Sequence, residues 1–67
     1  MNIGKKIKEL RDEQDLSQEE LAKALNISRS TLANYEVSAS QVPNDLIPLI
    51  AKHFGVTIDF LFGLKEM

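Results

Sequence analysis

Two serines begin runs of helix-forming residues in this sequence, and their hydroxyls define the first chemistry that it offers. Ser17 precedes Gln-Glu-Glu, and Ser28 precedes Arg-Ser-Thr. Each hydroxyl can accept a backbone N–H from the first turn of its helix, and the Glu20 carboxylate can accept the backbone N–H of Ser17 in return, forming a capping box. The backbone N–H groups that remain open at a helix start attract anions. This stretch therefore offers hydrogen bonds, first to the backbone and then to an anion where the caps allow it.

Residues for catalysis or metal binding do not form a recognisable set. The sequence has no cysteine, which excludes disulfides, thiolate metal sites and cysteine nucleophiles. His53 is the single histidine, and we interpret it as a surface or boundary residue. No serine–histidine–acid or paired-carboxylate arrangement stands out. We therefore expect no enzymatic activity, no cofactor and no bound metal.

Length and charge limit the class of protein. The 67 residues suffice for one small domain, 1–67. No apolar run approaches the about 20 residues of a membrane span, and the charged start MNIGKKIKELRDE has no signal-peptide core. We therefore expect a soluble, cytoplasmic protein with no membrane partner. The net charge is −2, so an anionic partner would have to bind at a local patch.

The hydrophobic pattern predicts an all-α protein with its helices around one core. Ile3, Ile7 and Leu10 form one stripe at helical spacing, and no strand pattern is visible. Pro48 is tolerated only in a first turn, so its helix is expected to begin irregularly and to become regular after it. We predict five short helices, over about 2–13, 18–25, 29–36, 44–54 and 58–62.

The second and third predicted helices are joined by a turn of three or four residues, and Ala22 supplies the small side chain that steeply crossing helices need. A helix held outward in this way fits the major groove of B-DNA, which is about 12 Å wide. The sequence resembles the phage-repressor type of helix-turn-helix protein, the Cro/C1 or XRE family, whose fold is the compact five-helix DNA-binding domain of the lambda-repressor type. The resemblance covers nearly the whole chain and rests on IKELR at 7–11, LSQEELA at 16–22, LNISRSTL at 25–32, NYE at 34–36 and IAKHFGVTIDFLFG at 50–63.

The resemblance implies roles for particular residues. Helix 29–36 would be the recognition helix, with Arg29, Ser30 and Asn34 at the positions that contact bases; Arg suits guanine and Asn suits adenine. Arg11 and Glu36 match a pair of residues that forms a buried or half-buried ion pair. The expected phosphate contacts are Ser17, Gln18, Ser28 and Thr31, with Lys5 and Lys6 as further candidates if they do not simply belong to a mixed solvated face.

The chain departs from the family after Glu36. The family usually has a glycine within two residues and then Lys or Arg, whereas 37–42 reads VSASQV, without glycine or basic residues. Few cations remain near the predicted face, so the log–log salt slope should be shallow, about −2 to −3 per subunit. Useful affinity would then require a homodimer. We predict self-association through Phe60, Phe62 or Leu64, the alternative being that these side chains close the core.

Two hypotheses of function follow. The first is a sequence-specific regulator of transcription that binds double-stranded DNA, most simply a bacterial or prophage repressor that blocks polymerase as a dimer on a two-fold operator. The second is a helix-turn-helix fold used for protein–protein interaction, as in an anti-repressor or an antitoxin. No small-molecule substrate is evident. The sequence is compatible both with a complete protein and with the DNA-binding part of a longer repressor.

Overall fold

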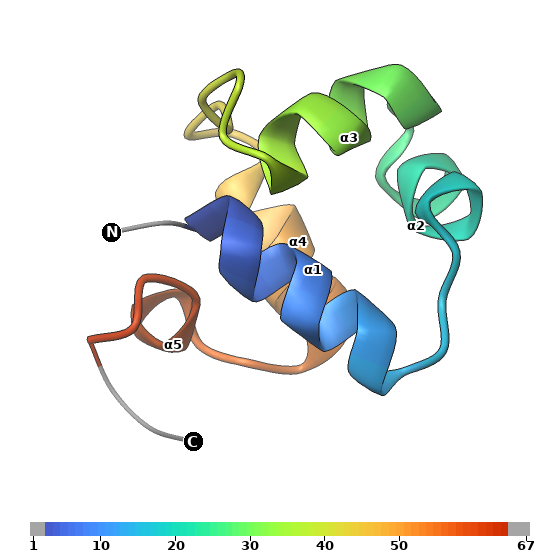
Figure 1. The fold of residues 1–67 in the computed structure, drawn as a ribbon. Helices are drawn as coiled ribbons and strands as arrows, with labels where there is room; N and C mark the ends of the chain where they lie inside the picture. Colours follow the sequence, from blue (N-terminus) through green and yellow to red (C-terminus); the bar gives the residue numbers. More distant parts are fainter. Residues whose placement is uncertain (1–2, 65–67) are drawn as a thin grey trace.

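The computed structural model describes residues 3–64, and within this range the chain forms five α-helices and no strand (Figure 1). The all-α fold predicted from the sequence is confirmed. In Figure 1, α3 lies across the top of the molecule, and α1 runs in front of α4. The helices are α1 (Ile3–Glu13), α2 (Gln18–Leu25), α3 (Arg29–Glu36), α4 (Ile47–Phe54) and α5 (Ile58–Leu61).

The helix-turn-helix unit, α2 and α3, is set by its caps. The Ser17 hydroxyl accepts the backbone N–H of Glu20 at 3.0 Å, and the backbone N–H of Ser17 donates to the Glu20 carboxylate at 2.9 Å. Asn26 ends α2 in the left-handed conformation, with φ 61°. Ser28 then caps α3 by accepting the backbone N–H of Thr31 at 3.1 Å. These three residues fix where one helix stops and the next begins.

Three predicted helix boundaries differ from the structure or lie outside it. The fourth helix begins at Ile47 rather than 44, because residues 44–46 form turns and Pro48 occupies the first turn, where its missing N–H is not needed. The fifth ends at Leu61 rather than 62, since Phe62 is its C-cap. The predicted start at residue 2 lies outside the described residues.

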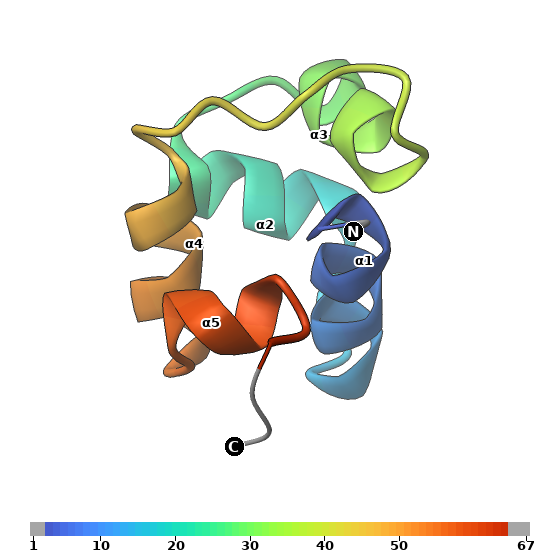
Figure 2. The same cartoon turned by 90° about the vertical axis from the view of Figure 1, so that its left-hand side faces the viewer.

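The core is assembled from every helix of the described chain. Five large side chains are essentially inaccessible to solvent, one from each helix: Ile7, Leu21, Leu32, Ile50 and Leu61. Figure 2 shows the consequence, with α4 and α1 on opposite sides and α2 and α5 between them. Because each helix contributes one buried anchor, none can leave without exposing apolar surface.

Gly4, which the sequence analysis did not single out, allows α1 to approach α3 closely. A Cβ atom at this position would overlap the backbone carbonyl oxygen of Tyr35. Gly4 is buried, and Tyr35 itself belongs to the core. The signal was present in the sequence: a glycine inside a helical pattern usually has a packing reason. Gly4 thus sets the spacing between α1 and the C-terminal end of α3.

A left-handed residue follows the C-terminus of α3, and it is a serine rather than a glycine. Ser38 has φ 62°, and the backbone N–H of Ala39 donates to the Asn34 carbonyl at 2.9 Å. A left-handed residue with a Cβ atom loses about 1–2 kcal/mol relative to its right-handed conformation. The turn after α3 therefore strains Ser38.

We predict that Ser38→Gly is more stable than Ser38→Ala by about 1 kcal/mol, because only glycine removes the Cβ penalty. Both variants lose the serine hydroxyl and its interactions, so their difference isolates the backbone effect. Thermal unfolding should show the glycine variant melting about 4–8 °C above the alanine variant. Equal melting temperatures would contradict the assignment of strain to Ser38.

Within residues 3–64, no helix is long and apolar enough to span a membrane.

Candidate nucleic-acid interface

The third helix has one buried face and one free face. Leu32, Tyr35 and Glu36 are buried, whereas Arg29 and Asn34 are exposed. Ser30 is exposed as well, next to Arg29 in the first turn. All three predicted base-contacting residues are therefore exposed on α3. Arg29 forms no ion pair within the described chain, so its five donors are open to a ligand.

Hydroxyl groups gather at the N-terminus of α3. The Ser28 Oγ atom lies 2.7 Å from Thr31 Oγ1 and 3.3 Å from Ser30 Oγ. The same Ser28 oxygen accepts the backbone N–H of Thr31, which leaves its proton to be shared with the neighbouring hydroxyls. The predicted phosphate contacts Ser28 and Thr31 therefore act as caps first. Only a hydroxyl proton not used in this cluster is available to an anion.

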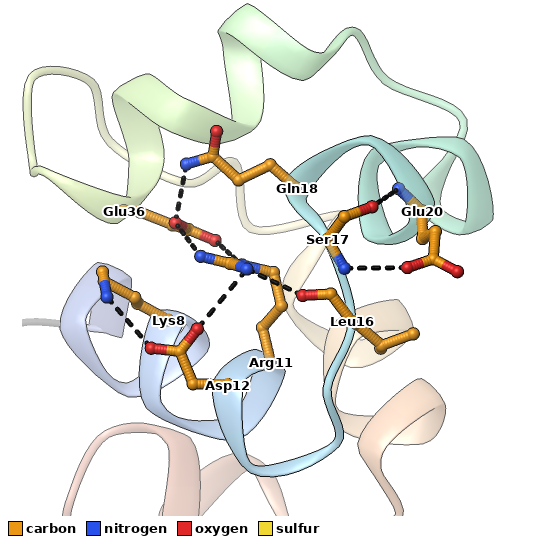
Figure 3. A network of polar contacts seen from close by, with 8 residues as sticks. All are labelled: Lys8, Arg11, Asp12, Leu16, Ser17, Gln18, Glu20 and Glu36. Atoms are coloured by element: carbon orange, nitrogen blue, oxygen red, sulfur yellow. Dashed lines mark hydrogen bonds and ion pairs between the residues drawn. The ribbon is translucent and has the colours of Figure 1, made fainter.

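A buried ion pair joins α1 to the C-terminal turn of α3 (Figure 3). Arg11 Nε donates to Glu36 Oε2 at 2.8 Å, and Arg11 Nη2 donates to Glu36 Oε1 at 3.2 Å. The Glu36 side chain is only 1% exposed and that of Arg11 only 11%. The bidentate hydrogen bonding to Glu36 is the main cause that raises the pKa of the Arg11 guanidinium. The pair fixes the orientation of α3 relative to α1.

The start of α2 is tied into the same network. Gln18 Nε2 donates to Glu36 Oε1 at 3.0 Å, and Arg11 Nη1 donates to the Leu16 carbonyl at 2.7 Å. Gln18, a predicted phosphate contact, thus directs its amide nitrogen inward, and one of its two N–H groups remains for a phosphate. The sequence analysis missed this contact, because it joins residues from two different helices. Figure 3 shows both α1 and α2 held to α3 through Glu36.

The capping box at Ser17 also carries charge. The backbone N–H of Ser17 lowers the pKa of the Glu20 carboxyl, so Glu20 stays ionised at neutral pH and keeps the cap closed. A carboxylate here partly neutralises the positive end of α2. Ser17 is exposed, but its hydroxyl also hydrogen-bonds the Glu20 carboxylate, so its proton is engaged within the cap. An anion at this helix start would meet the open backbone N–H groups.

The lysines of α1 are mostly engaged elsewhere. Lys6 Nζ lies 3.5 Å from the Glu9 carboxylate and 4.8 Å from the centre of the Phe60 ring on α5. This contact draws Lys6 toward α5, and we therefore leave it out of the interface proposed below. Lys8 Nζ pairs with Asp12 at 3.0 Å. Lys5 is exposed and has an interaction of its own.

The segment after α3 offers surface without charge. Residues 37–41 are exposed, and Val37 is 72% exposed. Val42 is buried, which fastens the segment to the core. Hydroxyl and amide groups of 38–41 can donate hydrogen bonds, but neutral donors release no counterions from DNA.

A short capped helix, a tight turn and a second helix with its outer face free define the class of helix-turn-helix proteins that bind DNA. Comparison with known families agrees. Residues 7–61 match the helix-turn-helix family, and the chain belongs to its Cro/C1-type (XRE) branch of DNA-binding transcriptional regulators. The family predicted from the sequence is confirmed.

Curated relatives come from bacteria and a phage. The antitoxin PezA of Streptococcus pneumoniae is 42% identical over 97% of this chain and 41% of its own length. The transcriptional regulator ImmR of Bacillus subtilis is 33% identical over 100% of this chain and 53% of its own. The cryptic phage CTXphi repressor RstR of Vibrio cholerae is 36% identical over 96% and 58%. The chain thus spans about half the length of these relatives. No solved structure gave a significant match.

Proposed function

We propose that this chain is a sequence-specific transcriptional repressor that places α3 in the major groove of double-stranded DNA. The observation that carries the proposal is the free outer face of α3, with Arg29, Ser30 and Asn34, behind which Glu36 is held by two other helices. A recognition helix reads bases only if its orientation in the groove is fixed, because each contact depends on a hydrogen bond of defined length and angle. The relative RstR is named as a repressor and the relative BcrR of Enterococcus faecalis as an activator, so these names do not separate the two roles.

Phosphate contacts would flank this helix. Ser17, Gln18, Ser28 and Thr31 lie at the starts of α2 and α3, where hydroxyl groups and open backbone N–H groups converge. These contacts position the protein without reading sequence. Base selection then falls to Arg29 and Asn34, whose side chains suit guanine and adenine.

The salt dependence of binding should be shallow. Arg29 and at most one lysine of α1 are near this face, since Lys6 is drawn to Phe60 and Glu9. With two phosphates neutralised, the log–log slope of affinity against salt should be about −2 per subunit. Fluorescence anisotropy over a salt series measures it. A slope several times steeper would show that other cations contact the DNA.

Weak binding by one subunit favours a two-fold dimer, with half-sites about one helical turn apart. Of the residues predicted at the interface, Phe60 and Phe62 pack partly against the core, whereas Leu64 is 69% exposed. Ile58 on α5 is also exposed, at 42%. We therefore place the proposed interface on Leu64 and Ile58.

Leu64→Asp should shift the chain to monomer in analytical ultracentrifugation and weaken operator binding by about tenfold or more, because an aspartate cannot be buried unpaired between subunits. Leu49→Asp on α4 is the matched control and should leave the association unchanged. A wild-type chain that stays monomeric to high micromolar concentration would overturn the dimer.

Selection of bound sequences from a random duplex pool tests the proposal directly. A palindromic motif should be enriched. Arg29→Ala should weaken binding to that motif by about 1–3 kcal/mol and relax one base position in each half-site. Lys52→Ala, which removes a cation from α4, should change neither. No enrichment at low salt would refute sequence-specific binding.

A second candidate function is binding to a protein partner, because the relative PezA is named as an antitoxin. The net charge of −2 and the uncharged segment 37–42 favour it as well. The same duplex selection separates the two functions, since a chain that works only through a protein partner would enrich no motif.

A further inference from the structure

A shallow apolar groove lies between the C-terminal end of α2 and α4, away from the surfaces described above. Figure 2 shows these two helices meeting on the side of the molecule opposite α1. Leu25 is buried in the groove, and Leu49, a large apolar side chain in the first turn of α4, is 54% exposed beside it. The complete lining is Ala24, Leu25, Asn26, Leu49, Lys52 and His53.

The groove carries a lysine and no acid. Lys52 lines it beside the His53 ring, and no carboxylate among the described residues does. Lys23 lies one residue before the lining residue Ala24 on the same exposed helix end. Neither lysine forms an ion pair within residues 3–64, in contrast to Lys6 and Lys8 on α1. On a chain with an overall negative charge, Lys52 at the groove and Lys23 next to it in sequence are both available to a partner.

We propose that this groove docks an acidic amphipathic helix of a partner protein. Apolar side chains of that helix, spaced by three or four residues, would pack on Leu25 and Leu49, as helices do in hydrophobic grooves. Aspartates or glutamates flanking them would pair with Lys52 and Lys23. A nucleic acid would not suit this surface, because its floor is apolar and its two lysines are too few to bind a phosphate backbone tightly.

The groove is separate from the proposed DNA contacts. None of its lining residues is among those assigned to bases or phosphates, so its occupancy can be tested independently of operator binding. Asn26 ends α2 two residues before Ser28, the N-cap of α3. A docked partner would therefore lie against the turn of the helix-turn-helix unit, where it could report on or alter the position of α3.

Selection from a phage-displayed library of randomised helical peptides tests the docking site. The wild-type chain is the bait, and Leu49→Asp is the counter-selection bait. We expect the enriched peptides to combine two or more aspartates or glutamates with large apolar residues at helical spacing. Chemical shifts of the ¹⁵N-labelled chain should then change mainly at residues 23–26 and 49–53. Enriched peptides without acids, no enrichment over Leu49→Asp, or shifts centred on α3 or α5 would each overturn the proposal.

Two variants of the groove test which of its residues contribute to the affinity for the selected peptide. Lys52→Glu should weaken it by about tenfold, since one ion pair becomes a repulsion, and Leu49→Asp by about tenfold or more, since the apolar anchor is lost. Val37→Asp is the matched control, an exposed apolar residue at the end of α3 outside both proposed interfaces, and should leave peptide affinity unchanged. Thermal melts confirm that each variant is folded. Equal affinity of the wild-type chain and Lys52→Glu would refute the charge complementarity.

Discussion

Gly4→Ala is expected to lower the free energy of unfolding by about 3 kcal/mol, even though alanine favours helices over glycine by about 1 kcal/mol. The reason is steric: the new Cβ atom would overlap the Tyr35 carbonyl oxygen, which belongs to the backbone of α3 and cannot rotate away. One helix must then shift against a close-packed core. Chemical denaturation followed by circular dichroism measures the change.

Gly55→Ala is the matched control. Gly55 has φ 68° and nothing within 4 Å of its would-be Cβ atom, so alanine there meets backbone strain but no neighbour. Its expected loss is about 1 kcal/mol. The pair thus separates steric overlap from conformational strain. If Gly4→Ala were as stable as the wild-type chain, α1 and α3 would not be in close contact at this point.

The same substitution should impair DNA binding before the chain unfolds. Tyr35 and Glu36 form the end of α3, so a displacement of α1 at Gly4 moves the recognition helix. Operator affinity measured below the melting temperature should therefore fall in Gly4→Ala. Gly55→Ala, which lies at the end of α4, should keep its affinity.

Glu36→Gln is expected to lower the free energy of unfolding by about 3 kcal/mol, because the Arg11 guanidinium loses its buried counter-charge. It keeps only the ion pair with the half-exposed carboxylate of Asp12, 3.4 Å from Nη1. The Glu36 carboxylate accepts from both Arg11 and Gln18, and a neutral amide cannot replace it. Operator affinity should also fall, since both α1 and α2 hold α3 through this one side chain. Denaturation and anisotropy titrations at one salt concentration measure the two effects.

Two further variants test whether the stability loss of Glu36→Gln comes from the buried charge of Arg11. Glu9→Gln removes an acid from the surface pair with Lys6, whose side chains are 49% and 30% exposed, and should change stability by less than about 1 kcal/mol. The double variant Arg11→Met with Glu36→Gln removes the stranded charge and should recover part of the stability lost in Glu36→Gln. A double variant no more stable than Glu36→Gln alone would contradict this explanation.

The caps explain why so much could be predicted from the sequence. Ser17, Glu20, Asn26 and Ser28 act on residues no more than four positions away, so their types and spacing fix the ends of α2 and α3 locally. Helix periodicity is local in the same sense, and it identified the apolar face of each helix. Pro48 displaced the start of α4 for a reason visible in the sequence, the absence of its N–H.

Some features of the candidate site could likewise be predicted from the sequence, and others could not. That α3 exists followed from its cap and its apolar spacing, and the roles of Arg29 and Asn34 followed from resemblance to a family. Where Lys6 goes did not, because a lysine in a mixed solvated face can turn to either side, and its contact with Phe60 joins residues far apart in the chain. The same holds for the amide of Gln18, which meets Glu36 only after three helices have packed.

By itself, the sequence determined the helices, their caps, the family and the face of α3 that is free, because each depends on neighbours along the chain. Only the tertiary structure decided how closely α1 approaches α3 at Gly4, which cations stay unpaired, and that Ser38 takes up the left-handed conformation without glycine. These features depend on distances between segments remote in sequence. Such distances are set by packing of the whole core, which no local pattern encodes.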